Sequence, residues 1–252
     1  MKTPMERAAA ALVSCQKLLV ITGAGISAES GIPTFRGAGG LWRGFDATRL
    51  ATPEAFAQDP QLVWDWYRWR RQICRRAVPN EGHQVIQRLE QAIPDFLLAT
   101  QNVDGLHPHA GTRRLVELHG DIDQARCVDR GCAVVFALPD RPEQEGAPLP
   151  ECPSCGGLAR PHILWFGEQY WDGILERIYA FMPGTQVVLV VGTSARVWPP
   201  VALALAAQKL GAFMIDVNPE ATDLSRQADV HLVGAGGSVL PELMRRAGLA
   251  SR

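Results

Sequence analysis

The chain has 252 residues, of which 47% are apolar and 20% are charged. Its 25 basic side chains nearly balance its 26 acidic ones, and the formal net charge is −1. This composition excludes an intrinsically disordered or collagen-like protein. The charge balance gives no reason to expect direct nucleic-acid binding. A chain of this length has room for one large domain with a smaller one inserted.

The sequence contains no apolar run that approaches the ~20 residues needed to span a bilayer. The segment Leu12 to Cys15 superficially resembles the end of a lipoprotein signal. However, Glu6 and Arg7 interrupt the apolar stretch before it, so a surface helix is favoured. We therefore expect a cytoplasmic protein without a membrane partner.

Short apolar, β-branched runs recur along the chain, and each ends at small or polar residues. They cover residues 17–21, 96–99, 115–118, 186–191, 212–217 and 230–233. Helical stretches such as 80–92 and 200–210 separate them. Continuous apolar strands between helices predict a parallel sheet covered on both faces, which is a doubly wound, Rossmann-like α/β fold. The strand ends should then converge on one crevice.

Two segments interrupt this alternation. Residues 39–79 are rich in Trp and Arg and helical in their second half, and residues 126–160 contain a cysteine module. We interpret both as insertions that form a smaller domain. The large domain then consists of residues 1–38, 80–125 and 161–252.

Four of the six cysteines have the spacing of a metal site. Two pairs, C-x4-C and C-x2-C, are separated by nineteen residues and comprise Cys127, Cys132, Cys152 and Cys155. Four thiolates favour one structural zinc ion, and the Pro-rich segment between the pairs has little else to bury. Two disulfides are the alternative, which a reducing compartment makes less favourable.

A glycine-rich loop follows the first predicted strand. Its sequence from Gly23 to Ala28 fits G-x-G-x-x-G/A, whose bare glycines let a pyrophosphate approach the backbone. The same spacing also occurs in ordinary tight turns, and no acidic residue ends a second strand as in dehydrogenases. The loop instead continues to Gly37 with an aromatic residue and an arginine, Phe35 and Arg36.

Motifs spread over nearly the whole chain closely resemble those of the sirtuins, the NAD-dependent protein deacylases. In the family's order, from about residue 17 to 240, they are Gly23 to Gly37, Gln101 to Asp104, His119-Gly120, the two cysteine pairs, Phe166 to Glu168, Gly192 to Ser194 and Asn218. The resemblance implies that an acyl-lysine amide oxygen attacks C1′ of the nicotinamide ribose. The products would be lysine, nicotinamide and 2′-O-acyl-ADP-ribose.

The resemblance also implies a role for each matching residue. His119 would be the general base, Asn102 would orient the ribose and a water, and Asp104 would accept from the nicotinamide carboxamide. The NAD contacts would be Gly23, Ala24, Gly25, Ser27, Glu29, Thr34, Phe35, Arg36, Trp42, Gln101, Asn102, Val103, Asp104, Gly192, Thr193, Ser194, Asn218, Pro219, Glu220 and Gly236. Structural roles are expected for the remaining histidines, which are His83, His107, His109, His162 and His231.

The segment Ile163 to Glu168 has the pattern of an exposed strand leaving the cysteine module. By resemblance it would pair with an extended acyl-lysine peptide through Phe166, Gly167 and Glu168, with Val103 also contacting the substrate. A buried strand is the alternative for Leu164 and Phe166.

Tyr67 and Arg70 lie three residues apart in a stretch predicted to be helical, so they share one face. The family's desuccinylase and demalonylase subgroup has a tyrosine and an arginine at this spacing, with a small residue nearby that Ala55 would match. A guanidinium and a phenol can satisfy the carboxylate of a succinyl or malonyl group. The alternative is an aromatic and basic helix with Arg70 solvated, as Arg68 and Arg71 are expected to be.

Two other functions remain open for such a chain. The first is NAD hydrolysis or ADP-ribosyl transfer in the same NAD pocket. The second is a non-catalytic NAD-sensing or zinc-ribbon module, which intact Asn102, Asp104 and His119 disfavour.

Overall fold

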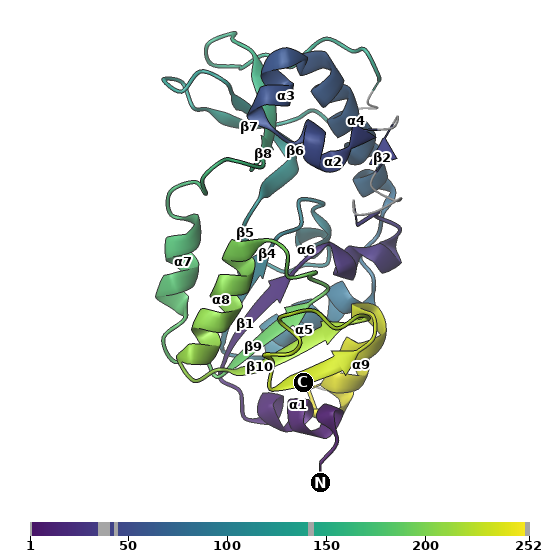
Figure 1. Cartoon of the computed structure of the whole chain (residues 1–252), viewed down its shortest axis with the longest axis vertical. Helices are drawn as coiled ribbons and strands as arrows, with labels where there is room; N and C mark the ends of the chain where they lie inside the picture. Colours follow the sequence, from purple (N-terminus) through teal and green to yellow (C-terminus); the bar gives the residue numbers. More distant parts are fainter. Residues whose placement is uncertain (1, 35–40, 43–44, 141–143, 250–252) are drawn as a thin grey trace.

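The computed structural model describes residues 2–34, 41–42, 45–140 and 144–249, and for residues 41, 42 and 45–47 it describes the backbone only. Figure 1 shows a larger part built on a central sheet and a smaller part above it. Within the described ranges, none of the helices is long and apolar enough to cross a bilayer.

The larger part contains a six-stranded sheet in which every pairing is parallel. Its order is β11-β10-β9-β1-β4-β5. The strands are β1 (Lys17–Thr22), β4 (Asp95–Thr100), β5 (Leu115–Glu117), β9 (Val187–Val191), β10 (Phe213–Asn218) and β11 (Val230–Val233). The chain adds strands β4 and β5 on one side of β1 and strands β9, β10 and β11 on the other. The direction of strand addition therefore reverses between β1 and β9, which is the topological switch point. The predicted doubly wound fold is confirmed.

Helices cover both faces of this sheet. One face packs against α1 (Pro4–Val13), α5 (Glu81–Ala92) and α9 (Gly236–Arg246), and the other against α7 (Ile174–Phe181) and α8 (Trp198–Lys209). In β1, Leu18 and Val20 belong to the first core, while Leu19 and Ile21 belong to the second. Because both faces are buried, the central strands are mostly continuous apolar runs rather than alternating apolar and polar residues.

The smaller part combines the two predicted insertions. Its helices are α2 (Ala47–Leu50), α3 (Pro53–Gln58) and α4 (Pro60–Arg76). Its strands are β2 (Leu41–Trp42), β3 (Phe45–Asp46), β6 (Gly120–Cys127), β7 (Val135–Ala137) and β8 (Ala159–Ile163). The sheet β7-β6-β8 therefore extends from Gly120 to Ile163, a few residues beyond the module predicted at 126–160. It shares one apolar core with α3 and α4.

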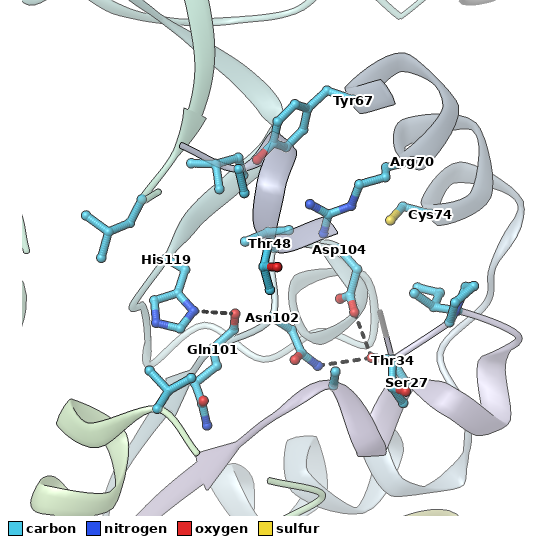
Figure 2. Close-up of a pocket in the computed structure, with 18 of the residues that line it drawn as sticks. Ser27, Thr34, Thr48, Tyr67, Arg70, Cys74, Gln101, Asn102, Asp104 and His119 are labelled. Atoms are coloured by element: carbon cyan, nitrogen blue, oxygen red, sulfur yellow. Dashed lines mark hydrogen bonds between the residues drawn. The ribbon is translucent and has the colours of Figure 1, made fainter. Parts of the chain in front are cut away.

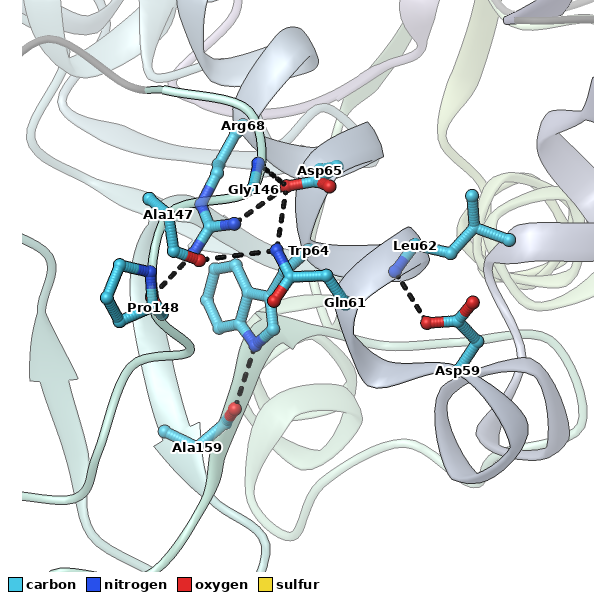
Figure 3. A network of polar contacts seen from close by, with 10 residues as sticks. All are labelled: Asp59, Gln61, Leu62, Trp64, Asp65, Arg68, Gly146, Ala147, Pro148 and Ala159. Atoms are coloured by element: carbon cyan, nitrogen blue, oxygen red, sulfur yellow. Dashed lines mark hydrogen bonds and ion pairs between the residues drawn. The ribbon is translucent and has the colours of Figure 1, made fainter.

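Polar contacts also attach the cysteine module to α4, as Figure 3 shows. The Asp65 carboxylate accepts hydrogen bonds from Gln61, Arg68 and the Gly146 N–H. Arg68 donates to the Pro148 carbonyl at 2.7 Å. The expectation that Arg68 and Arg71 are solvated is wrong, because both are at least 95% buried. Arg71 pairs with Asp123 on β6, and the module covers this face of α4.

Candidate active site

The loops after β1 and β9 meet at the topological switch point. The Gly25 N–H donates to the Gly192 carbonyl at 2.8 Å. A Cβ on Gly25 would lie 2.7 Å from that oxygen, and one on Gly23 2.9 Å from it. Positions 23 and 25 of the predicted phosphate loop therefore need glycine for a second reason, because any side chain there would clash with the backbone at Gly192. The chain continues from them as a short 3-10 helix, Ala24–Ser30.

Ser27 is the centre of a buried polar network at this edge, shown in Figure 2. Its hydroxyl donates to Asp104 Oδ2 at 2.7 Å and accepts from Asn102 Nδ2 at 3.1 Å. The other Asp104 oxygen accepts the Leu106 N–H at 3.0 Å, which fixes the carboxylate. The tertiary structure thus brings together three predicted site residues from two separate strand ends.

His83 supports this network from behind. The Asn80 N–H donates to His83 Nδ1 at 3.3 Å, so the neutral ring carries its proton on Nε2, which lies 3.4 Å from the Ser27 hydroxyl. Burial lowers the pKa of His83 to about 4, although the Asp104 charge opposes this shift. His83 is therefore neutral and holds Ser27 in place, in agreement with a structural role.

His119 lies at the end of β5, opposite this network. Its Nδ1 is 3.0 Å from the Gln101 carbonyl oxygen, which only accepts, so Nδ1 carries the proton and the lone pair is on Nε2. Burial lowers the pKa of His119 to about 4, with the Gln101 bond opposing the shift. The imidazole is therefore neutral and has one nitrogen able to accept a proton.

His119 Nε2, the nitrogen with the lone pair, is hydrogen-bonded to the Tyr170 hydroxyl at 2.9 Å. Burial raises the pKa of Tyr170 to about 12, so the phenol keeps its proton and donates it to the lone pair. A ligand hydroxyl that is to bond Nε2 must take the place of the phenol. Tyr170 was not predicted as a site residue, because an isolated tyrosine in a loop carries no sequence signal for this contact.

A cavity of about 460 Å³ lies between the polar network, His119 and α4. It has 21 lining residues in the described part of the chain. Those among them predicted as site residues are Ala24, Ser27, Thr34, Tyr67, Arg70, Gln101, Asn102, Val103, Asp104, His119 and Phe166. Strand ends of the large domain and helices of the small one therefore contribute to a single cavity.

Other predicted cofactor residues lie along the same sheet edge, outside this cavity. Asn218 Nδ2 donates to the Thr193 carbonyl at 2.6 Å, and Gln101 donates to the Thr193 hydroxyl at 3.2 Å. Glu29 accepts the Gly237 N–H at 2.7 Å, which places it at the start of α9. Ser194 follows Thr193 in the loop after β9, Gly236 is the first residue of α9, and Pro219 and Glu220 are exposed just after β10. The predicted residues Phe35 and Arg36, and the Trp42 side chain, lie outside the described residues.

Tyr67 and Arg70 lie on one face of α4, as predicted, and both line the cavity. Tyr67 is fully buried, and its hydroxyl accepts a hydrogen bond from Trp165 Nε1 at 2.9 Å. The Arg70 guanidinium lies 5.3 Å from the Tyr67 ring centroid, and Figure 2 shows it reaching from α4 into the cavity. Ala55 is half-buried on α3 and does not line the cavity, whereas Ala51 does.

The prediction of an exposed strand from Ile163 to Glu168 is wrong beyond its first residue. Strand β8 ends at Ile163, and the Glu168 N–H returns to the Trp165 carbonyl at 3.1 Å in a turn with Gly167 at φ 84°. The Glu168 carboxylate holds this turn, because it accepts the Trp165 N–H at 2.8 Å and pairs with Arg160. Phe166 remains 54% exposed, while Trp165 is buried.

The four cysteines of the module converge on one point. Their sulfur atoms all lie within 4.8 Å of one another, with separations of 3.5 Å for Cys127–Cys155 and 3.6 Å for Cys132–Cys152. A tetrahedral zinc ion with Zn–S of about 2.3 Å places its sulfurs about 3.8 Å apart. A disulfide needs about 2.05 Å, so the disulfide alternative does not fit. The donor set is that of a single structural zinc ion.

Comparisons with known proteins agree with this geometry. The chain is 48% identical over 217 residues to an NAD-dependent protein deacylase of Aquifex aeolicus, covering 85% of this chain and 88% of that one. It superimposes on a Sir2 homologue in complex with NAD with a TM-score of 0.91 at 40% identity, covering 97% and 95% of the two chains.

A second solved structure, Sir2Af2 bound to a myristoylated histone peptide, gives a TM-score of 0.75 at 28% identity and covers 98% and 97%. The model of the Sir2 family matches residues 23–199. These matches extend over more than half of the chain and include both the crevice and the cysteine module. The chain therefore belongs to the Sir2 family, the sirtuins.

Proposed function

We propose that this chain is an NAD-dependent protein-lysine deacylase, which transfers an acyl group from lysine to the ADP-ribose part of NAD and releases nicotinamide. The observation that carries the proposal is the placement of His119, Asn102 and Asp104 around one cavity beside the Gly23–Gly192 crevice. NAD, as co-substrate, supplies the electrophilic ribose carbon and accepts the acyl group. The name of the Aquifex aeolicus relative, an NAD-dependent protein deacylase, supports the activity, and the Sir2 homologue in complex with NAD supports the co-substrate.

The residues of the network have distinct tasks in this reaction. Asp104, fixed by Ser27 and the Leu106 N–H, presents its carboxylate to the carboxamide of nicotinamide. Asn102 keeps its amide carbonyl available for the ribose or a water, because its N–H is used by Ser27. His119, neutral and protonated on Nδ1, takes the proton of a ribose hydroxyl at Nε2.

The acyl-lysine enters from the side of α4 and the Ile163–Glu168 segment. Phe166 supports this direction, since it is half exposed and also lines the cavity. The Leu164 and Phe166 N–H groups already bond the carbonyls of His119 and Ala51, so an added peptide strand would pair with the remaining backbone groups of the turn. A myristoylated histone peptide bound to Sir2Af2 is an example of such a ligand in the family.

The proposal is tested by incubating the protein with NAD, with and without an acetylated lysine peptide, and measuring nicotinamide and peptide mass. A deacylase releases nicotinamide in proportion to deacylated peptide and little without it. Equal nicotinamide release in both reactions would instead identify an NAD hydrolase, and ADP-ribose attached to protein would identify a transferase. Absence of turnover with NAD still bound would identify an NAD-sensing module.

We further propose that succinyl and malonyl groups are removed in addition to acetyl. Tyr67 and Arg70 line the same cavity as Trp66 and Ala51, and the Arg70 guanidinium lies 4.9 Å from the Trp66 ring centroid. A terminal carboxylate that enters the cavity without a partner would be costly to bury, and the Tyr67 hydroxyl and the Arg70 guanidinium can bind it with charge-assisted hydrogen bonds.

Arg70→Met is expected to cost roughly 2–4 kcal/mol of transition-state stabilisation for desuccinylation, because the carboxylate loses its charged partner. Deacetylation should change far less, because the acetyl group ends in an uncharged methyl group that makes no ion pair with the guanidinium. Values of kcat/KM for acetyl and succinyl forms of one peptide measure both effects. Arg76→Met, an exposed change on the same helix, serves as control. Equal loss of both activities in Arg70→Met would overturn the selectivity.

The pH dependence should reflect the environment of His119. The base acts in its neutral form, and burial lowers its pKa to about 4, so protonation begins only well below neutral pH. We expect kcat/KM to stay within about twofold between about pH 6 and 7.5. A fall in kcat/KM with decreasing pH whose midpoint lies near the ordinary histidine pKa would contradict this expectation. Zinc content is measured at each pH, because acid also protonates thiolate ligands.

We also propose a cytoplasmic location, because a cluster of four thiolates together with the unbridged Cys15 and Cys74 suits a reducing compartment.

A further inference from the structure

Trp165 contacts a cavity-lining residue without lining the cavity itself. Its indole Nε1 lies 2.9 Å from the Tyr67 hydroxyl oxygen, and both side chains are at least 98% buried. An indole N–H only donates, so the phenol oxygen is the acceptor. Within the described part of the chain, this is the only hydrogen bond of the Tyr67 hydroxyl. Its own proton is therefore available to a ligand.

The indole is held firmly in this position. The Arg160 guanidinium stacks on it, 3.4 Å from the ring centroid, and the Phe56 ring lies 5.3 Å away. Arg160 also bonds Glu168 at 2.9 Å, and the same carboxylate accepts the Trp165 backbone N–H. Burial opposes ionisation of Glu168, but the Arg160 bonds outweigh it and lower its pKa, so the pair is charged.

We propose that Trp165 is a positioning residue for acyl selectivity. Its N–H occupies a lone pair of the Tyr67 hydroxyl and so directs the phenol proton into the cavity, toward the carboxylate of an acidic acyl group bound by Arg70. The resulting chain, N–H to phenol O–H to carboxylate, strengthens each bond by polarisation. This inference rests on the proposed removal of succinyl and malonyl groups. The Glu168 and Arg160 side chains contribute to this selectivity by holding the indole in place.

Acetyl-lysine provides the internal comparison. Its acyl group ends in a methyl group, which cannot accept the phenol proton, so the orientation of the Tyr67 hydroxyl should not affect deacetylation. A purely structural role of Trp165 would affect both acyl groups alike. The ratio of the two activities therefore separates positioning from stability.

The variant Trp165→Phe removes the N–H and keeps a ring for Arg160 to stack on. We expect its kcat/KM for a succinyl peptide to fall about tenfold, with the acetyl peptide within about twofold. Trp64→Phe is the matched control: Trp64 is buried in the same core, and its N–H bonds the Ala159 carbonyl at 2.9 Å instead. That variant should change both activities by the same factor.

A double-mutant cycle with Tyr67→Phe tests the route through the phenol. Once the hydroxyl is absent, Trp165→Phe should cost nothing further with the succinyl peptide. The inference is overturned if the tenfold loss persists in that background, or if Trp165→Phe lowers both activities equally or neither. If the wild-type enzyme removes succinyl groups and Tyr67→Phe impairs this activity, the proposed function stands, whatever the result for Trp165→Phe. A wild-type enzyme inactive on succinyl-lysine overturns both.

Discussion

Replacing His119 with alanine is expected to reduce deacylation by about 10²–10⁴-fold, the usual contribution of a general base. The substitution removes the nitrogen that accepts the ribose proton and leaves the Ser27–Asn102–Asp104 network intact, since none of its hydrogen bonds involves His119. NAD should therefore still bind with an affinity near that of the wild type. The loss should appear in kcat, because the base acts in the chemical step.

Single-turnover deacylation and equilibrium NAD binding measure the two properties separately. His109→Ala is the control, because His109 is an exposed histidine on α6 (Leu106–His109), outside the cavity. It should retain full activity. Near-normal turnover in His119→Ala would remove this residue from the mechanism, and loss of NAD binding in the same variant would make its role one of binding instead.

Removal of zinc should have the second large effect. The ion would join two loops that the sheet β7-β6-β8 holds only partly, since β7 spans three residues. Structural zinc sites in small modules contribute about 10–16 kcal/mol of apparent binding energy to folding. We expect a strong chelator to unfold the residues around the four cysteines and to inactivate the enzyme indirectly, because this module packs on α4, which carries Tyr67 and Arg70.

Elemental analysis should find one zinc ion per chain, and loss of metal should parallel loss of activity and of the near-ultraviolet signal of the tryptophans. Cys132→Ser should bind zinc weakly, whereas Cys15→Ser, a buried cysteine outside the cluster, should keep it. A protein that is fully active without metal, or that contains both cysteine pairs oxidised, would contradict the assignment.

Much of the fold could be predicted because its elements depend on local pattern. Strand β9 and the residues of β1 from Leu18 to Ile21 are continuously apolar since both faces of the sheet are covered, and that pattern is visible without coordinates. The meeting of Asn102 with Ser27 follows from the same principle, because parallel strands end at one edge. The cysteine spacing likewise predicted the cluster, since ligand geometry limits loop length.

Predictions failed where contacts distant in sequence decide the outcome. Arg68 and Arg71 are charged residues on a helix and were expected to be solvated, yet both are buried. Arg71 pairs with Asp123 of β6, and Arg68 donates to the Pro148 carbonyl of the cysteine module. The strand expected to continue to Glu168 becomes a turn, because Arg160 binds that carboxylate.

The sequence by itself determined the doubly wound sheet, the zinc ligands and the identity of the polar residues at the strand ends, because periodicity and spacing are local properties. Only the tertiary structure decided how those residues are oriented. The proton of His119 is on Nδ1 because a carbonyl 18 residues away faces it, and the phenol of Tyr67 accepts from an indole 98 residues away. Hydrogen-bond direction depends on which groups packing brings within about 3 Å of each other, and no local pattern encodes it.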